Sequence, residues 1–528
     1  MPGRRTLPCP STLLVFFVAS VLAAGCPDND EEGDRTEVAL PNLDNSAENA
    51  RIEKSLIAEV DSQMSLVCKR PVLLGQPLPG PAGGDMLAAL GGAPELEACL
   101  AVSRGKMKGL SAALWFPEGA RPPGVPARLL RTVRPLGDPA ADGDSVREVA
   151  TACEPLAGLV QRAVRHEDAC SPYMPGLRGQ PAIEPIMDVR RALVVLIRHR
   201  LEAGDVHAGV DLLLNGVRIG QDLKRGNSSA LLAMLANSFM DRQLQLLELV
   251  LNRPGKLGDR LLASIERRLG MLIESEPHPG DFMAGDYLAF CLYEILPALR
   301  GEGYTPPGGF GPMGPPEARE FKEPRERKYF RVAMLSSWER LRSGWAERCT
   351  PQMSGGECQR ALIAWTGPLK QRQVRDHAER EKRLAVALVA GMESGMIEEL
   401  ITQTLQIAAP PSVDYLKKNG RIAFALAGLR LHAAFRRLAE QHKRCPVLED
   451  FDREPLKSLR IDPYSGEPIR IEPGSGGVKW VLRPPMDLKK EAGGGGSWKA
   501  DPADPAVFIE CPDLRSKKVI RKKRRRRR

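Results

Sequence analysis

The sequence predicts a mainly α-helical protein, either an antiparallel helical bundle or stacked helical hairpins, with a small C-terminal α+β module and disordered ends. Apolar residues recur at helical spacing in successive segments between residues 144 and 300. A glycine followed by an N-cap-type residue separates several of these segments, as at Gly204-Asp205 and Gly258-Asp259. Short connections favour antiparallel neighbours. Two alternating segments around Pro473-Gly-Ser-Gly-Gly predict a β-hairpin near the C-terminus.

The N-terminal half is expected to contain most of the helical body. A first helix is expected over 45–69, and it leads into a Pro/Gly-rich irregular subdomain, so that residues 51–143 form one region. The helical domain then occupies 144–300. Its six expected helices lie at 144–166, 185–203, 205–224, 227–252, 258–275 and 281–299. We find no fixed-period consensus, so no named repeat family is indicated.

The C-terminal half is expected to begin with a Pro/Gly linker over 301–325, which separates a second helical block over 326–442 from the first. A small β-hairpin module over 443–484 follows, and residues 485–528 read as a disordered basic tail. Helix candidates in the second block lie at 329–346, 360–365, 371–394, 397–407 and 421–442.

The first 25 residues have the features of a secretory signal peptide. Two arginines precede an apolar run from Thr12 to Gly25, which is shorter than the roughly 20 residues of a membrane span. The segment from Leu22 to Cys26 resembles the lipobox of bacterial lipoproteins, which implies cleavage before Cys26 and its acylation by several chains such as palmitate. Residues 26–50 then form an acidic tether. The alternative is an ordinary signal peptide that happens to end at a cysteine.

Cysteine usage fits an oxidising compartment. Eleven cysteines, less Cys9 in the signal peptide and Cys26, leave nine. We expect Cys291, inside an apolar run, to be a buried thiol that forms no disulfide. No CxxC occurs, so we expect neither a metal ion nor a cofactor. Possible disulfides join Cys349 to Cys358 and Cys153 to Cys170, and further plausible pairs are Cys68 with Cys99 and Cys445 with Cys511.

The net charge of +10 resides at the C-terminal end, because residues 515–528 contain eleven Lys or Arg residues and no acid, and the rest of the chain sums to about −1. In an exported protein, the nearest anionic partners are lipids, lipopolysaccharide or cell-wall polysaccharide. A tail without a specific partner is the alternative, and nucleic acid is not expected because no aromatic residues are interleaved. The cations are Arg515, Lys517, Lys518, Arg521, Lys522, Lys523, Arg524, Arg525, Arg526, Arg527 and Arg528.

Three short motifs resemble catalytic or binding sequences, but their context argues against each. The G-x-G-x-x-G match at 309–314 contains and precedes prolines that prevent the required helix. The S-x-x-K match at 103–106 contains Gly105 and lacks its partner motifs. The cluster from His166 to Cys170 reads as a charged helix end before a disulfide cysteine. No catalytic residue is therefore predicted.

The segment from Asp462 to Arg470, after a helix over 421–442, resembles the C-terminal region of type II secretion pseudopilins. There, a long helix leads to a small sheet through an Asp-Pro-x-x-Gly-x-Pro segment. Asp462-Pro463 is expected to start a turn, Gly466 to take a positive φ, and Pro468 to open an edge strand. The pseudopilin leader and membrane helix are absent, so the resemblance implies a shared α+β piece and not membership.

These observations together predict a non-catalytic, lipid-anchored protein of the bacterial cell envelope, on the exported side of a membrane. Its helical faces are expected to bind a protein partner, while the tail adds an electrostatic contact. The sequence leaves open which membrane holds the anchor. An envelope hydrolase or peptidoglycan-active enzyme, with a site assembled from distant residues, is the alternative function.

Overall fold

The fold comes from a computed structural model that describes eleven stretches of the chain and three single residues. The stretches are 46–67, 98–99, 147–165, 183–225, 230–253, 255–279, 343–358, 360–362, 394–474, 478–485 and 506–511, with residues 101, 291 and 364 between them.

 The signal peptide, most of the tether, the segment 281–299 apart from residue 291, and residues 512–528 of the basic tail lie outside these ranges, as do the motifs at 103–106, 166–170 and 309–314.

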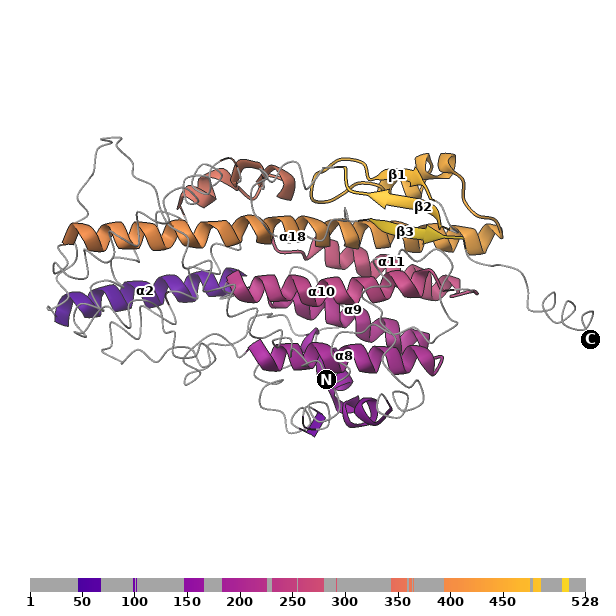
Figure 1. Ribbon diagram of the computed structural model, residues 1–528, viewed down its shortest axis with the longest axis horizontal. Helices are drawn as coiled ribbons and strands as arrows, with labels where there is room; N and C mark the ends of the chain where they lie inside the picture. The colour runs from indigo at the N-terminus through magenta and orange to yellow at the C-terminus, as the bar shows by residue number, and fades with distance from the viewer. Residues whose placement is uncertain are drawn as a thin grey trace, which may run out of the picture.

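The described helices confirm the mainly α-helical prediction, and a small antiparallel sheet lies near the C-terminus (Figure 1). Five helices of the first block lie close to their expected ranges. They are α7 (Glu154–Ala163), α8 (Ile183–Glu202), α9 (Val206–Asp222), α10 (Ala230–Leu251) and α11 (Asp259–Glu274), and α2 (Ser46–Val67) precedes them. Among the described helices, none is both long enough and apolar enough to cross a bilayer.

The expected helix boundaries have visible local causes. Gly204 has a φ of +88°, and Asp205 then caps α9 by accepting a hydrogen bond from the Ala208 amide at 3.2 Å. A left-handed residue is easily adopted by glycine, and a side-chain oxygen at the N-cap satisfies an otherwise unbonded amide. Gly258 has a φ of +90° and is itself the N-cap of α11.

The second helical block differs from the prediction, because its main helix is continuous and is not packed as a separate unit. Helix α18 (Ser394–His442) replaces the two helices expected at 397–407 and 421–442, and it runs through Pro410-Pro411. A proline inside a helix removes an amide donor and usually kinks or breaks the helix, which is why two separate helices were expected. Buried residues of α18 share one hydrophobic core with those of α7 to α11.

Side-chain contacts fasten α18 to the connection between α10 and α11. Arg436 donates hydrogen bonds to the carbonyls of Leu251 and Gly255. Glu440 accepts from the amides of Leu257 at 2.9 Å and Gly258 at 3.0 Å. One side chain thus satisfies carbonyls at the end of α10, and the other satisfies amides at the start of α11, where helices otherwise leave such groups unbonded.

The C-terminal sheet packs on the last part of α18. Its strands β1 (Arg470–Pro473), β2 (Val478–Arg483) and β3 (Val507–Glu510) are antiparallel in the order β1-β2-β3, which confirms the expected hairpin. Phe435 of α18 stacks on Phe451, and Phe451 meets Trp480 of β2 edge-on, with ring centroids 5.7 and 5.8 Å apart. This aromatic row joins the helix to the sheet.

Strand β3 corrects the expectation that residues 485–528 are a disordered tail throughout. Its edge is bonded to side chains of α10, because Glu248 accepts from the Phe508 amide at 2.8 Å and Asn252 accepts from the Glu510 amide at 2.9 Å. Asn252 also donates to the Phe508 carbonyl at 2.8 Å. The alternation of apolar residues from Val507 to Ile509, between two prolines, is typical of a strand. The strand was not predicted because the linker and the charged segment around it indicate disorder.

Candidate functional site: a histidine beside a disulfide loop

Three disulfides cross-link the described residues, and they correct two expected pairings. Cys349 is bonded to Cys358, and Cys445 to Cys511, as expected. Cys153 is bonded to Cys99 and not to Cys170, and Cys99 is consequently not the partner of Cys68. The two partners are 54 residues apart, and sequence spacing carries no information about such a contact. Cys291 is buried and belongs to none of these disulfides.

The Cys349–Cys358 disulfide closes a loop with its own internal hydrogen bonds. Glu357 accepts from the Ser354 amide at 2.7 Å and from the Ser354 hydroxyl at 3.0 Å. The Glu357 amide in turn donates to the Ser354 hydroxyl at 3.3 Å. The hydrogen bond from the Ser354 amide, and secondly the one from its hydroxyl, lower the pKa of Glu357. The reciprocal pattern is that of a capping box, and it begins the helical turn that carries Cys358.

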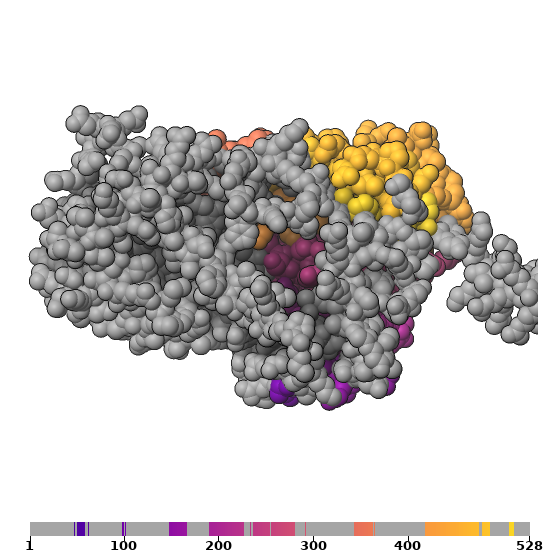
Figure 2. Space-filling view, viewed as in Figure 1, coloured from indigo at the N-terminus to yellow at the C-terminus, as the bar shows by residue number. Residues whose placement is uncertain are grey.

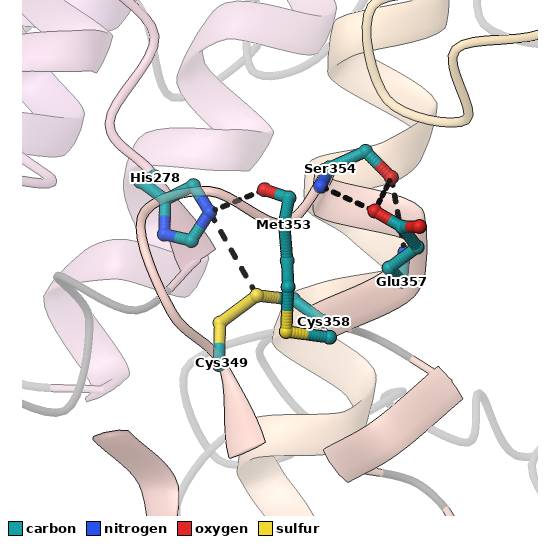
Figure 3. Close-up of a disulfide and its surroundings, with 6 residues drawn as sticks. All are labelled: His278, Cys349, Met353, Ser354, Glu357 and Cys358. Atoms are coloured by element: carbon teal, nitrogen blue, oxygen red, sulfur yellow. Dashed lines mark hydrogen bonds between the residues drawn. A yellow bond between two sulfur atoms is a disulfide. The ribbon is translucent and has the colours of Figure 1, made fainter. Parts of the chain in front are cut away.

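His278 lies against this loop from the segment after α11 (Figure 3). Its Nε2 atom is 3.0 Å from the Met353 carbonyl oxygen and 3.7 Å from the Sγ atom of Cys358. A ring nitrogen that bonds to a carbonyl oxygen must carry the hydrogen, so Nε2 is the donor here. One His278 nitrogen and the two sulfurs all lie within 4.8 Å of one another.

The opposite side of the loop packs on the turn predicted at Asp462. Tyr464 fills the space beside Gly355 and Gly420, where an added Cβ would lie 2.5 and 2.8 Å from its ring. The Tyr464 carbonyl also accepts from the Gly356 amide at 2.6 Å. The loop therefore lies where the end of α11, the helix α18 and the C-terminal module meet, and glycine is needed for the close approach.

The Asp462 turn forms as the sequence predicts. Asp462 accepts from the Tyr464 amide at 3.3 Å and from the Ser465 hydroxyl at 2.8 Å, and Gly466 has a φ of +74°. An isolated bridge pairs Ile461 with Pro468, just before β1. Burial raises the pKa of Asp462. Its carboxylate is thus used within the turn, which supports a structural role.

A buried polar network adjoins the segment that carries His278. Lys224 forms an ion pair with Glu276 and donates to the Asn419 side chain at 2.7 Å. Gln221 donates to the Leu272 carbonyl at 2.6 Å and to Glu276 at 2.7 Å. Burial is the main cause that lowers the pKa of Lys224, while Glu276 opposes it. The network ties the ends of α9 and α11 to α18.

Sequence reasoning missed His278. The residue lies between Pro277 and Pro279 in a short connection, a setting that fixes the backbone and would have been a usable signal. Cys26 and the eleven tail cations lie outside the described residues. The donor set that the structure brings together is one imidazole nitrogen and the two sulfurs of a disulfide. In their reduced form, cysteine sulfurs beside an imidazole are ligands that suit a soft or borderline metal ion.

Figure 2 shows one face of the molecule, on which residues of the C-terminal module gather in a patch at the upper right. Comparison of the chain with protein-family models, with curated proteins and with solved structures returned no match.

Proposed function

We propose that this protein is an exported, lipid-anchored protein of the bacterial cell envelope with a non-catalytic scaffold role. The observation that carries the proposal is the set of three disulfides among the described residues. Disulfides persist in oxidising compartments and are rare in the cytosol. This agrees with the signal-peptide pattern and with the lipobox-like sequence that ends at Cys26.

The scaffold role is supported by the way the described residues are fastened together. The disulfide from Cys445 to Cys511 secures β3, and the loop from Cys349 to Cys358 packs between a helix end and the C-terminal module. A body with many such cross-connections presents fixed surfaces, which favours binding of a protein partner with little loss of conformational entropy. The acidic segment after Cys26 would hold this body away from the lipid surface.

The lipid anchor is tested by intact mass and detergent partitioning of the mature protein. We expect a chain that begins at acylated Cys26 and enters the detergent phase. Cys26→Ser should abolish both acylation and partitioning. Cys9→Ser is the matched control, because this cysteine lies in the segment that is cleaved away, and it should change neither result. A mature wild-type chain without acyl groups would refute the anchor.

The basic tail is proposed to add a contact with an anionic lipid surface. Cys511 is fixed by its disulfide, so the eleven cations follow directly from an anchored point on the body. Each Lys or Arg near an anionic surface contributes about 1 kcal/mol, and salt screens this attraction.

The tail is tested with vesicles that contain phosphatidylglycerol, on a Cys26→Ser background that removes the lipid anchor. Truncation after Cys511 retains β3 and the disulfide, and it should abolish binding. A tail of equal length with glutamine at the eleven cationic positions is the control for length. Wild-type binding should weaken steeply as salt rises. Equal binding to neutral vesicles would contradict an electrostatic contact.

A further inference from the structure

We propose that Cys349, Cys358 and His278 form a binding site for a divalent cation of the zinc class when the disulfide between the two cysteines is reduced. The inference goes beyond the proposed scaffold role and does not depend on the anchor. It starts from the three donor atoms, which lie within 4.8 Å of one another and come from two separate segments of the chain. Zinc sites commonly combine cysteine sulfurs with histidine nitrogens.

The distances fit such a site closely on the histidine side. Zinc lies about 2.3 Å from sulfur and about 2.0–2.1 Å from nitrogen in a tetrahedral site, so neighbouring N and S ligands are about 3.5 Å apart. The His278 Nε2 atom is 3.7 Å from Cys358 Sγ. The two sulfurs must separate from bonding distance to about 3.8 Å. Cys349 Sγ, which lies within 4.8 Å of a His278 nitrogen, must also come to about 3.5 Å from it. A side-chain rotation of Cys349 or a small shift of the loop supplies this movement.

The surroundings also suit a bound cation. Cys349 and Cys358 are buried, so the thiolates are shielded from water. The His278 nitrogen that now donates to the Met353 carbonyl would instead offer its lone pair to the cation, with the hydrogen moved to Nδ1. Because the cation would take the place of this hydrogen, the Met353 carbonyl has to turn away from the ring nitrogen. With three protein ligands, a water molecule completes the tetrahedron.

The chemistry balances with a dithiol or phosphine as the reductant. Two electrons and two protons convert the disulfide into two thiols. A dithiol supplies them and is oxidised to a new disulfide, whereas a phosphine supplies the electrons, takes its oxygen atom from water to become the phosphine oxide, and leaves the two protons of that water on the thiols. The cation then displaces one proton from each thiol, and both protons pass to solvent. Binding is therefore tighter at higher pH.

The competing explanation is that His278 only holds the loop through its hydrogen bond to the Met353 carbonyl. His278→Gln separates the two explanations, because the glutamine amide can still donate to this carbonyl but is a poor ligand for zinc. A purely structural role predicts that this variant behaves like the wild type.

The experiment uses the full chain reduced with a phosphine and titrated with Co²⁺, whose thiolate charge-transfer and tetrahedral absorption bands report ligation. We expect no bands for the oxidised chain and clear bands for the reduced chain, which Zn²⁺ removes. His278→Gln should weaken binding at least tenfold, and Cys358→Ser should remove this site. The control Cys99→Ser/Cys153→Ser lacks a different disulfide and should keep the signal. Equal binding by all of these variants would overturn the proposal.

A second measurement covers the case in which the reduced chain loses its fold. The reduced protein is reoxidised with and without Zn²⁺, and each disulfide is followed by alkylation and peptide mass. We expect Zn²⁺ to slow the closure of Cys349–Cys358 and to leave Cys99–Cys153 unaffected. In His278→Gln the delay should shrink. Equal effects on both disulfides, or none on either, would also overturn the proposal.

Discussion

At the scale of single residues, His432 is a polar side chain in the core whose burial lowers the stability of the folded protein. The residue is fully buried on α18, and neither ring nitrogen has a hydrogen-bond partner among the described residues. Burial, and secondly the charge of Arg436, lower its pKa from 6.5 to about 3. The imidazole is therefore neutral in the folded protein at neutral pH, and an apolar side chain would satisfy this position at least as well.

His432 should make the protein less stable as the pH falls. The folded-state pKa is depressed, so below pH 6.5 the unfolded chain binds a proton that the folded chain does not, until the pH approaches 3. Between these two pH values, His432 lowers the free energy of unfolding by up to about 1.4 kcal/mol for each unit that the pH falls. His432→Leu should reduce this slope in urea unfolding between pH 7.5 and 5. His442→Gln, at an exposed position of the same helix, should leave the slope unchanged.

At the scale of elements, β3 shows how a short strand far along the chain is held in place. Backbone groups of β3 bond to Glu248 and Asn252 of α10, and the next residue after the strand is cross-linked to Cys445. A four-residue strand has too few ladder hydrogen bonds to be stable alone. Its position therefore depends on α10 and on the disulfide together.

The attachment of β3 should weaken as the pH rises through neutrality. Burial raises the pKa of Glu510 from 4.5 to about 7. This contribution to stability is complete below pH 4.5 and is lost as the pH rises through about 7. Amide hydrogen exchange at Phe508 and Glu510 should thus show greater opening at pH 8 than at pH 5.5, after correction for intrinsic rates. Glu510→Gln should remove most of this difference, whereas Glu467→Gln, at an exposed position, should preserve it.

At the scale of the whole molecule, the two helical blocks of the sequence form one packed body. Arg437 of α18 pairs with Glu266 of α11 at 3.0 Å, and Gln441 donates to Asp259 at 2.7 Å. The hydrogen bonds of Arg436 and Glu440 add contacts between α18 and the connection from α10 to α11. Breaking these contacts would expose a common hydrophobic core on both sides.

The shared core predicts that α9, α10, α11 and the buried part of α18 unfold together in the oxidised protein. Removal of one member would expose apolar surface on the others, so partial unfolding is costly. Hydrogen exchange in increasing denaturant should show protection lost at one concentration in all four helices. Loss of protection in α18 well before α9 would show that the second block is an independent unit.

Local structure was readable from the sequence because its causes lie within a few residues. The glycine and aspartate before α9, the helical spacing of its apolar residues, and the alternation in β2 act through neighbouring positions. The turn at Asp462 was predictable for the same reason. The approximate bounds of helices α8 to α11 and the hairpin were therefore determined by the sequence alone, whereas the continuity of α18 was not.

Contacts between distant segments were decided only by the tertiary structure. Cys99 pairs with Cys153, His278 approaches Cys358, and α10 holds β3, although each pair is separated by dozens of residues or more. These contacts depend on how several helices pack at once, and sequence spacing does not encode that arrangement. The candidate site therefore forms only when the chain folds. Packing then brings the His278 imidazole to the Cys349–Cys358 disulfide, a pairing that the spacing of the two cysteines predicts.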